Sequence, residues 1–348
     1  MKGTMIKVAN NKDYNRVSVL VVGAGPAGLA AAIQLKTMKS DLDVCVVEKS
    51  ADLGNHNLSG AVLEAEPLHT LLDSAIPGWQ NSDAAKDVLA NRIDKDDIMF
   101  LLGKTLAFNI FFAIKLAKVF RLGFGQMIHQ GDYSISISKL TKWMGQIAKD
   151  LGVEVLTGFG VQDIHLNGFG TGAASVKLVD QGLDKEGNKQ PNYVEGEVIG
   201  TDFVVLAEGC DGLVTEKFVE KANLKRQSPQ LYSVGVKELI KVSPEQYNKF
   251  TSGRVVHAMG YPIWTPVIGP GMFGGGIVYA GVQDHLSVGM IVGADWRYCD
   301  FNVQDALTNL KNHRFVKQFI DGGVVVEAGA KMIPEGGYNA IPRDPDTG

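Results

Sequence analysis

The chain has 348 residues, 45% of them hydrophobic, and a formal net charge of only −4. This length predicts about two or three structural units around a substantial core, and the small net charge gives no electrostatic case for nucleic-acid binding. Cys45, Cys210 and Cys299 are too few and too scattered for a zinc site or a disulfide framework, which favours reduced thiols in a cytoplasm-like compartment. We therefore predict no metal site, and residues 1–16 lack the apolar stretch of a secretory signal.

Residues 19–36, VLVVGAGPAGLAAAIQLK, have the pattern of a buried strand, a glycine-rich turn and a helix. Gly23 permits the tight turn, Gly25 lets a pyrophosphate approach the main chain, and Gly28 lets helix and strand pack closely. The helix N-terminus offers free N–H groups and a partial positive charge to the phosphates. The predicted cofactor-binding turn comprises Gly23, Ala24, Gly25, Pro26, Ala27 and Gly28.

The second predicted strand, residues 43–48, ends in Glu48, which lies 20 residues after Gly28. An acid at this spacing is typical of a ligand for a ribose hydroxyl, so Glu48 and the following Lys49 are predicted to bind the cofactor. A ribose 2′-phosphate would meet a like charge there, and NADP is therefore not expected. The alternative is a glycine-rich turn in an ordinary βαβ unit with Glu48 merely solvated.

The next hundred residues change composition sharply. Residues 53–64 are expected to form a loop near the cofactor crevice or a plain surface connection, and residues 73–97 a linker with one short helix. Residues 98–124 are mostly apolar but carry several cations, too many for a comfortable transmembrane helix. This segment fits either a helix lying in a membrane interface or a core helix or strand pair of a second domain.

Two later segments extend the predicted nucleotide-binding fold. Residues 138–151 predict a helix with Ser138 as N-cap and Gly152 past its end, followed by a strand at 153–156 and a hairpin within 174–199. Residues 202–221 repeat the order of strand, glycine turn and helix. This second junction, with Asp211 and Gly212, either places backbone amides near the cofactor or is a simple turn.

From residue 226 onward the composition is rich in β-formers and broken by glycines, which predicts a mainly antiparallel sheet with one helix at 303–320. His257, His285 and His313 have no ligand-like spacing and are interpreted as surface or hydrogen-bonded histidines. No side chain stands out as a general acid or base, so no catalytic residue is predicted.

Several short blocks occur in one order from about Val17 to Pro342: VCVVEK, SKLTKWMG, LAEGCDG, YSVGVKEL, GRVVHAMGYP, FGGGIVY, VGMIVGADW and EGG followed by AIP. Together they resemble the electron-transfer flavoprotein-ubiquinone oxidoreductases. The resemblance implies an α/β fold of mixed α+β character, in which a Rossmann-type FAD-binding domain carries an inserted, mainly antiparallel substrate or quinone domain.

The resemblance also implies the chemistry and its site. Electrons would pass from reduced electron-transfer flavoprotein through FAD to ubiquinone, with a 4Fe-4S cluster in the full-length family member. The enzyme would lie peripherally on a membrane surface, at the cytoplasmic face of a bacterial inner membrane or the matrix face of a mitochondrial one. Beyond the phosphate turn and Glu48, the matching positions are Ser59 and Gly60 near the flavin, Asp211 and Gly212 of the Asp-Gly element, and Gly274 and Gly275 near the quinone.

The composition changes and the resemblance together predict the domain limits. The expected FAD-binding domain comprises 15–80 and 131–225, with a linker and apolar, membrane-facing segment at 81–130, a quinone domain at 226–342 and a truncated end at 343–348. Family members continue with a four-cysteine cluster domain, which three scattered cysteines cannot supply, so a fragment or a missing partner is expected. The alternative functions are a related FAD-dependent reductase or monooxygenase of an apolar substrate, and a non-catalytic nucleotide-binding fragment.

Overall fold

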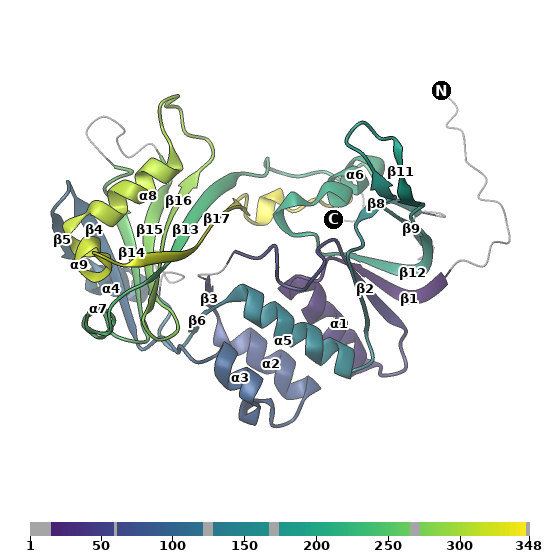
Figure 1. Ribbon diagram of the computed structural model, residues 1–348, viewed down its shortest axis with the longest axis horizontal. Helices are drawn as coiled ribbons and strands as arrows, with labels where there is room; N and C mark the ends of the chain where they lie inside the picture. The colour runs from purple at the N-terminus through teal and green to yellow at the C-terminus, as the bar shows by residue number, and fades with distance from the viewer. Residues whose placement is uncertain (1–14, 59–60, 121–127, 167–173, 265–271, 346–348) are drawn as a thin grey trace. The chain divides into compact units, whose positions relative to one another are not determined.

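The computed structural model describes residues 15–58, 61–120, 128–166, 174–264 and 272–345 (Figure 1). The chain forms two compact units. The first comprises Met1–Leu53 and Gly145–Phe218, and the second comprises Gly54–Met144 and Val219–Gly348.

The first unit is built on a six-stranded sheet in the order β7-β2-β1-β12-β9-β8 among the residues described. Strands β1 (Asn15–Val22), β2 (Val44–Glu48), β7 (Glu154–Thr157) and β12 (Val198–Leu206) are parallel, and β8 (Val161–Leu166) and β9 (Ala174–Leu178) continue the sheet in antiparallel fashion. Leu20, Val21 and Val46 are fully buried, as expected of parallel strands with both faces covered. The predicted Rossmann-type class is confirmed.

Three helices are adjacent in the chain to strands of this sheet. Helix α1 (Pro26–Met38) follows β1, α5 (Ile137–Asp150) leads into β7, and α6 (Leu213–Lys221) follows β12. Helix α5 begins one residue before the predicted Ser138, because the hydroxyl of Ser136 accepts the Lys139 N–H at 3.4 Å. Gly152 has φ +83°, the left-handed conformation expected just after a helix. The predicted projecting hairpin consists of β10 (Gln181–Leu183) and β11 (Lys189–Val194).

The second unit contains a seven-stranded sheet in the order β17-β13-β16-β15-β14-β4-β5, counted over the described segments. Neighbouring strands are antiparallel except for β14 and β4, which are parallel. The strands are β4 (Lys95–Leu102), β5 (Leu106–Asn109), β13 (Tyr232–Lys241), β14 (Arg254–Gly260), β15 (Gly274–Ala280), β16 (His285–Gly293) and β17 (Val324–Pro334). The predicted, mainly antiparallel sheet after residue 226 is therefore confirmed.

Helices cover one face of this sheet. Helix α8 (Val303–Asn312) packs on β13 and β16, and a Cβ at Gly276 would lie 2.6 Å from Cδ2 of Leu310. The core beneath α8 and α9 (Arg314–Ile320) includes the fully buried Leu307, Phe250 and Met290. The smaller elements of this unit are β3 (Ala61–Leu63), β6 (Tyr133–Ile135), α2 (Ala65–Ala75), α3 (Asp83–Val88), α4 (Phe111–Val119), α7 (Pro244–Phe250) and the 3₁₀ turns η1 (Trp79–Asn81) and η5 (Tyr338–Ala340).

The single helix predicted at 303–320 is wrong, because the chain breaks at His313. This residue is extended, with φ −64° and ψ 133°, and its Nδ1 accepts the Phe315 N–H at 3.2 Å. A side-chain acceptor at this position caps the start of α9 and ends the run of helical dihedrals. Histidine is not among the usual capping residues, so the pattern gave no sign of the break.

In the predicted segment 98–124, the described residues 98–120 form a hairpin and a helix rather than one long helix. Strands β4 and β5 pair edge to edge, and α4 follows them. Ile98 and Leu101 are buried, so β4 corresponds to the alternative of a core strand pair. Residues 54–144 lie as a whole with the sheet unit, whereas the predicted limits had placed 54–80 and 131–144 with the nucleotide-binding part. One link is the Ser134 hydroxyl of β6, which donates to the Ala280 carbonyl of β15 at 2.9 Å.

Candidate functional site

The first turn of α1 is open to an anion. Gly25 precedes the helix with φ −73° and ψ 177°, no side chain caps the turn, and Pro26 stands at the first helical position, where it removes an N–H that has no helical partner. Ala27 and Gly28 follow within this first turn. The backbone thus has the uncapped helix N-terminus that phosphate binding requires, and phosphate binding itself stays a prediction.

Each of the three motif glycines has its own structural role. Gly23 has φ +100°, and a Cβ there would lie 2.4 Å from the Ala207 carbonyl oxygen. A Cβ on Gly28 would lie 2.0 Å from the Gly23 carbonyl oxygen, so both residues hold the turn against the sheet. A Cβ on Gly25 would meet nothing within 4 Å. Its lack of a side chain leaves open space beside the helix N-terminus, where a diphosphate would approach.

Glu48 is held at the end of β2 by two main-chain donors. Its Oε2 accepts the Ala24 N–H at 2.9 Å, and its Oε1 accepts the Ser50 N–H at 2.8 Å. The first bond ties the carboxylate directly to the phosphate-binding turn, and each oxygen keeps a lone pair for a further donor. Lys49, also predicted to bind the cofactor, is exposed.

The second strand-turn-helix junction lies directly beside the first. Ala207, the residue directly after β12, is the one against which both Gly23 and Gly28 pack. The turn continues through the 3₁₀ helix η3 (Gly209–Asp211) and Gly212, whose φ is +25°. The structure therefore brings the backbone of the Asp211-Gly212 element to the same end of the sheet as Gly23 and Gly28, whereas Ser59 and Gly60 lie outside the described residues.

Glu208 is a site-shaping residue that the sequence analysis did not select. Its Oε2 accepts the Thr215 N–H and hydroxyl, both at 2.7 Å, and its Oε1 accepts the Val214 N–H at 3.3 Å. This carboxylate occupies the N-terminus of α6 and fixes the turn that carries Asp211. The available signal was an acid just before a glycine turn that opens a helix, since anionic side chains stabilise helix N-termini.

Gly274 and Gly275 begin β15 in the second unit, and both are needed for close strand packing. Gly274 has φ +154°, and a Cβ there would lie 2.6 Å from the Ile291 carbonyl oxygen. A Cβ on Gly275 would lie 2.6 Å from the Ala258 carbonyl oxygen. Their contact with a quinone stays a prediction.

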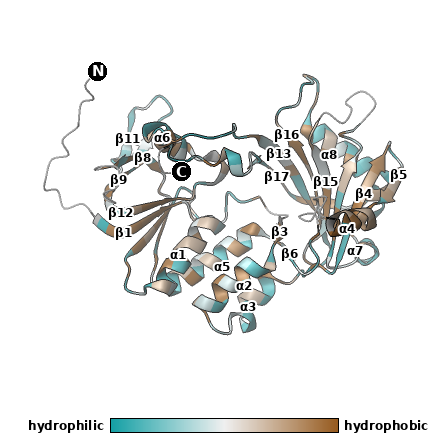
Figure 2. Cartoon of the chain, turned by 180° about the vertical axis from the view of Figure 1, so that it is seen from behind, coloured by the Kyte–Doolittle hydropathy of each residue, from teal (hydrophilic) through white to brown (hydrophobic). Residues whose placement is uncertain are grey.

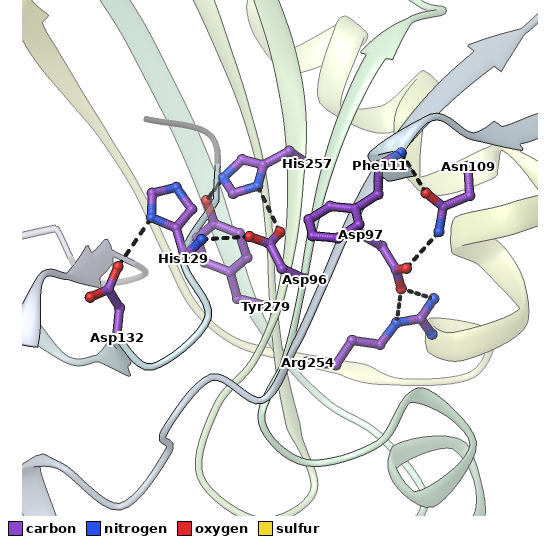
Figure 3. Close-up of polar contacts among 9 residues, drawn as sticks. All are labelled: Asp96, Asp97, Asn109, Phe111, His129, Asp132, Arg254, His257 and Tyr279. Atoms are coloured by element: carbon purple, nitrogen blue, oxygen red, sulfur yellow. Dashed lines mark hydrogen bonds and ion pairs between the residues drawn. The ribbon is translucent and has the colours of Figure 1, made fainter. Parts of the chain in front are cut away.

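A buried ion pair ties the apolar segment to the sheet (Figure 3). The Arg254 guanidinium of β14 contacts Asp97 Oδ2 of β4 through both Nε and a terminal nitrogen at 2.7 Å. The Asn109 amide donates to Asp97 Oδ1 at 2.6 Å, and Asn109 Oδ1 accepts the Phe111 N–H at 2.9 Å. This chain of bonds runs from the sheet through the end of β5 to the first residue of α4, and so fixes where the apolar helix begins.

A second polar cluster lies beside it and contains Asp96, His129, His257 and Tyr279 (Figure 3). Asp96 is buried, and its Oδ2 accepts the His129 N–H at 2.6 Å. Its Oδ1 lies 3.9 Å from His257 Nδ1, and neither atom has a hydrogen-bond partner among the described residues. Burial, together with the Asp96 charge, raises the pKa of Tyr279. The phenol therefore stays protonated, and its oxygen is hydrogen-bonded to His257 Nε2 at 2.6 Å.

The cysteines do not fit an iron-sulfur cluster. Cys45 is buried in β2, and burial raises the pKa of its thiol to about 12, so it stays protonated. Cys299 is exposed, and the described part of the chain contains no group of three or more His, Cys, Asp or Glu side chains arranged to hold a metal ion. A cluster bound by four thiolates would need ligands from outside these residues.

Two family profiles match the chain. The profile described as an NAD(P)-binding Rossmann-like domain matches residues 21–91, and the one described as ETF-QO, ubiquinone-binding, matches residues 232–333. The chain is 32% identical to the mitochondrial electron transfer flavoprotein-ubiquinone oxidoreductase of Dictyostelium discoideum, over 95% of this chain and 51% of that protein. The enzyme of this name from Pseudomonas aeruginosa is 33% identical, over 95% of this chain and 57% of its own length.

The predicted resemblance to the electron transfer flavoprotein-ubiquinone oxidoreductases is confirmed. The chain spans about half the length of the curated relatives it matches.

Solved structures of a flavoprotein and of a reductase-like protein share the fold. A flavoprotein/dehydrogenase from Cytophaga hutchinsonii has a TM-score of 0.58 at 20% identity and covers 91% of this chain and 66% of its own. A geranylgeranyl bacteriochlorophyll reductase-like protein from Thermoplasma acidophilum has a TM-score of 0.60 at 17% identity, over 92% and 67%. At these identities the likeness concerns the fold alone. In the described residues, no helix combines the length and the apolar character needed to span a bilayer.

Proposed function

We propose that the chain is the flavin-binding and quinone-binding part of an electron-transfer flavoprotein-ubiquinone oxidoreductase. The proposal rests on two features that occur in the same chain. An uncapped helix N-terminus with Glu48 fixed beside it precedes a sheet whose residues 232–333 match a ubiquinone-binding profile. Electrons would enter from reduced electron-transfer flavoprotein and leave to ubiquinone.

Each residue of the nucleotide unit has a defined task in this proposal. The amides of the first turn of α1 bind the pyrophosphate of FAD, and Gly25 lets it come close. Glu48 accepts hydrogen bonds from the adenosine ribose, for which its orientation is set in advance by Ala24 and Ser50. FAD supplies the redox chemistry when bound, so the chain needs no acid or base for electron transfer itself. The proposal assigns the 4Fe-4S cluster of the full-length family to no residue of this chain.

We further propose that an apolar surface on β4, β5 and α4 docks on a membrane, at the cytoplasmic face in a bacterium or the matrix face in a mitochondrion. Phe112 and Val119 are 78% and 71% exposed, and α4 is brown in the hydropathy colouring (Figure 2). Exposed Lys104 and Lys115 add cations suited to anionic headgroups. A quinone with a long apolar tail partitions into lipid, which gives the enzyme a reason to lie there. The exposed apolar side chains of this surface are Leu102, Leu106, Phe108, Phe112, Leu116, Val119 and Phe120.

An electron-transfer assay distinguishes the candidate functions. The purified chain is supplied with FAD, its absorption spectrum is recorded, and reduced electron-transfer flavoprotein and then a soluble ubiquinone analogue are added. The proposal expects bound flavin that is reduced by the first and reoxidised by the second. A chain that retains no flavin absorbance after unbound FAD is removed contradicts the proposal. Bound flavin that neither step affects would indicate a nucleotide-binding fragment.

A reductase or monooxygenase is the second candidate, because flavin monooxygenases share the fold. The flavin-dependent monooxygenase PieE, for example, has a TM-score of 0.60 at 12% identity over 93% of this chain. Rapid reduction of the bound flavin by NADH or NADPH would favour this candidate. The main proposal expects neither nucleotide to reduce the flavin.

Flotation with vesicles tests the membrane surface. The double variant Phe112→Asp and Val119→Asp should lose most of its flotation with vesicles of phosphatidylcholine and anionic phospholipid. A matched control, Met38→Asp with Val194→Asp, changes apolar side chains that are 77% and 61% exposed elsewhere, and should float like the wild type. Equal flotation of all three proteins would reject the docking surface.

A further inference from the structure

Lys237 is a buried amine without a hydrogen-bond or ion-pair partner among the described residues. It lies in the middle of β13 and is only 6% exposed. Its ammonium group makes no hydrogen bond or ion pair with any residue that the structure describes. Burial of an ammonium group is unfavourable unless something binds it, and the charge of Glu327 offsets this cost only in part.

The face of the sheet on which Lys237 lies follows from its neighbours. Glu238, the next residue, is ion-paired with Lys311 of α8, so Glu238 faces the helices. Side chains alternate along a strand, and Lys237 therefore points to the opposite face. Ile277 lies on this opposite face as well, because it follows Gly276, whose missing side chain makes room for Leu310 of α8.

Apolar side chains flank the amine on both sides. Lys237 pairs directly with Gly289 of β16 and Gly329 of β17. Ile277 leans over Gly289, where a Cβ would lie 3.0 Å from its Cγ1, and Leu58 lies over Gly329, where a Cβ would lie 2.6 Å from its Cδ1. A polar group between apolar side chains is typical of a site that orients a small, mainly apolar molecule.

The environment also makes this amine ready to exchange a proton. Burial lowers the pKa of Lys237 to about 8, and the charge of Glu327 opposes the shift. Besides Glu327, the titratable groups that the strand register places on this face include Lys241 of β13, Lys331 of β17, His285 of β16, Tyr279 of β15, His257 of β14 and Asp96 of β4. Both forms of the amine are therefore populated slightly above neutral pH, which is the condition for an efficient proton donor.

The predicted quinone contact lies on the same sheet face. Gly275 pairs with Ile291, and Ile291 pairs with Gly235, two residues before Lys237. The two positions are therefore separated by two strand spacings, about 10 Å, and by two residues along the strand, about 7 Å. An extended lysine side chain and a substituted quinone ring together span such a distance.

We propose that Lys237 donates a proton to a carbonyl oxygen of the ubiquinone head group, an inference that rests on the proposed function. Two electrons from the reduced flavin and two protons convert both quinone carbonyls to hydroxyls. As one carbonyl oxygen takes up electrons, an N–H bond of the ammonium breaks and an O–H bond forms. The neutral amine then takes a proton from water, and the second proton of the quinol comes from solvent.

Three substitutions test the donor. Lys237→Met removes the amine at similar length, and Lys237→Arg keeps the charge but cannot release its proton. Lys241→Met is the matched control, because Lys241 is exposed at the end of the same strand. The proposal expects both Lys237 variants to lower kcat for ubiquinone-1 reduction about 100-fold, with flavin reduction by electron-transfer flavoprotein unchanged. Wild-type turnover should fall above about pH 8 as Lys237 deprotonates, and Lys237→Met should lack this fall.

The outcomes separate this inference from the proposed function. Wild-type and Lys237→Met proteins with the same kcat and pH profile would overturn the role of Lys237 while leaving quinone reduction intact. A wild type that reduces no quinone would instead reject the proposed function. If a variant fails to fold, the wild type labelled with ¹³C at lysine Cε decides the question by NMR. One resonance should titrate near pH 8 and shift when ubiquinone-1 is added, and the absence of either response would refute the donor.

Discussion

The two units place polar groups by different means. In the nucleotide unit the backbone does this, through the open amides of α1 and through glycines that bring α1 and β12 together. In the sheet unit the polar groups are buried side chains on strands far apart in the chain, such as Asp97 and Arg254, which are 157 residues apart. A backbone site depends on positions that lack a side chain, which the sequence shows as glycines. A side-chain site depends on which strands become neighbours.

The largest effect is expected from breaking the buried ion pair of the sheet unit. Asp97→Asn leaves the Arg254 guanidinium, whose side chain is 11% exposed, without its counter-charge. We expect the free energy of unfolding in urea to fall by about 3–5 kcal/mol. The double variant Asp97→Asn with Arg254→Met should lose less than the sum of the single losses. Additive losses would mean that the pair is not coupled.

In the nucleotide unit, the matching change is a methyl group at Gly28. A Cβ there would lie 2.0 Å from the Gly23 carbonyl oxygen, so helix and turn must separate. Gly28→Ala should therefore lower the free energy of unfolding by about 3 kcal/mol and abolish FAD binding. Thermal unfolding followed by circular dichroism and flavin fluorescence measure the two effects. A variant as stable as the wild type would show that the turn can accommodate a methyl group at residue 28.

Lys237→Met should stabilise the chain, in contrast to the first two changes. The pKa of Lys237 falls from 10.5 to about 8 on folding, so the folded chain binds fewer protons than the unfolded chain between these values. Below pH 8 this penalty amounts to about 3 kcal/mol, which the methionine variant avoids. The gain should shrink as pH rises from 8 toward 10. Urea unfolding at pH 7 and pH 10 measures it, and a gain independent of pH would contradict the lowered pKa.

The smallest effect on stability is expected at Gly25, which separates ligand binding from folding within one motif. A methyl group there meets nothing within 4 Å, and φ of −73° suits any residue. Gly25→Ala should change the free energy of unfolding by less than about 1 kcal/mol while weakening FAD binding on the order of tenfold, because the methyl group occupies the path of the diphosphate. Unchanged FAD affinity, measured by fluorescence titration, would mean that the cofactor does not approach this residue.

Much of the nucleotide unit could be predicted, because its signals are local. The strand, glycine turn and helix at 19–36 and the second junction at 202–221 were both expected, and the contact of Gly23 and Gly28 with Ala207 explains why they lie side by side. Glu208 was missed because its role depends on the exact turn that returns α6 toward it. In the sheet unit, the edge hairpin was hidden inside an apolar run whose letters suit a helix as well as a strand.

The sequence by itself determined the phosphate-binding turn, the acid at the end of the second strand and the antiparallel nature of the later sheet, because glycine spacing and alternation act between close neighbours in the chain. Only the tertiary structure decided that β4 joins β14, that Asp97 meets Arg254, and that Lys237 lies between glycines of the two neighbouring strands. These depend on strand order and register. A shift of register by a single residue would move every one of those side chains to the opposite face.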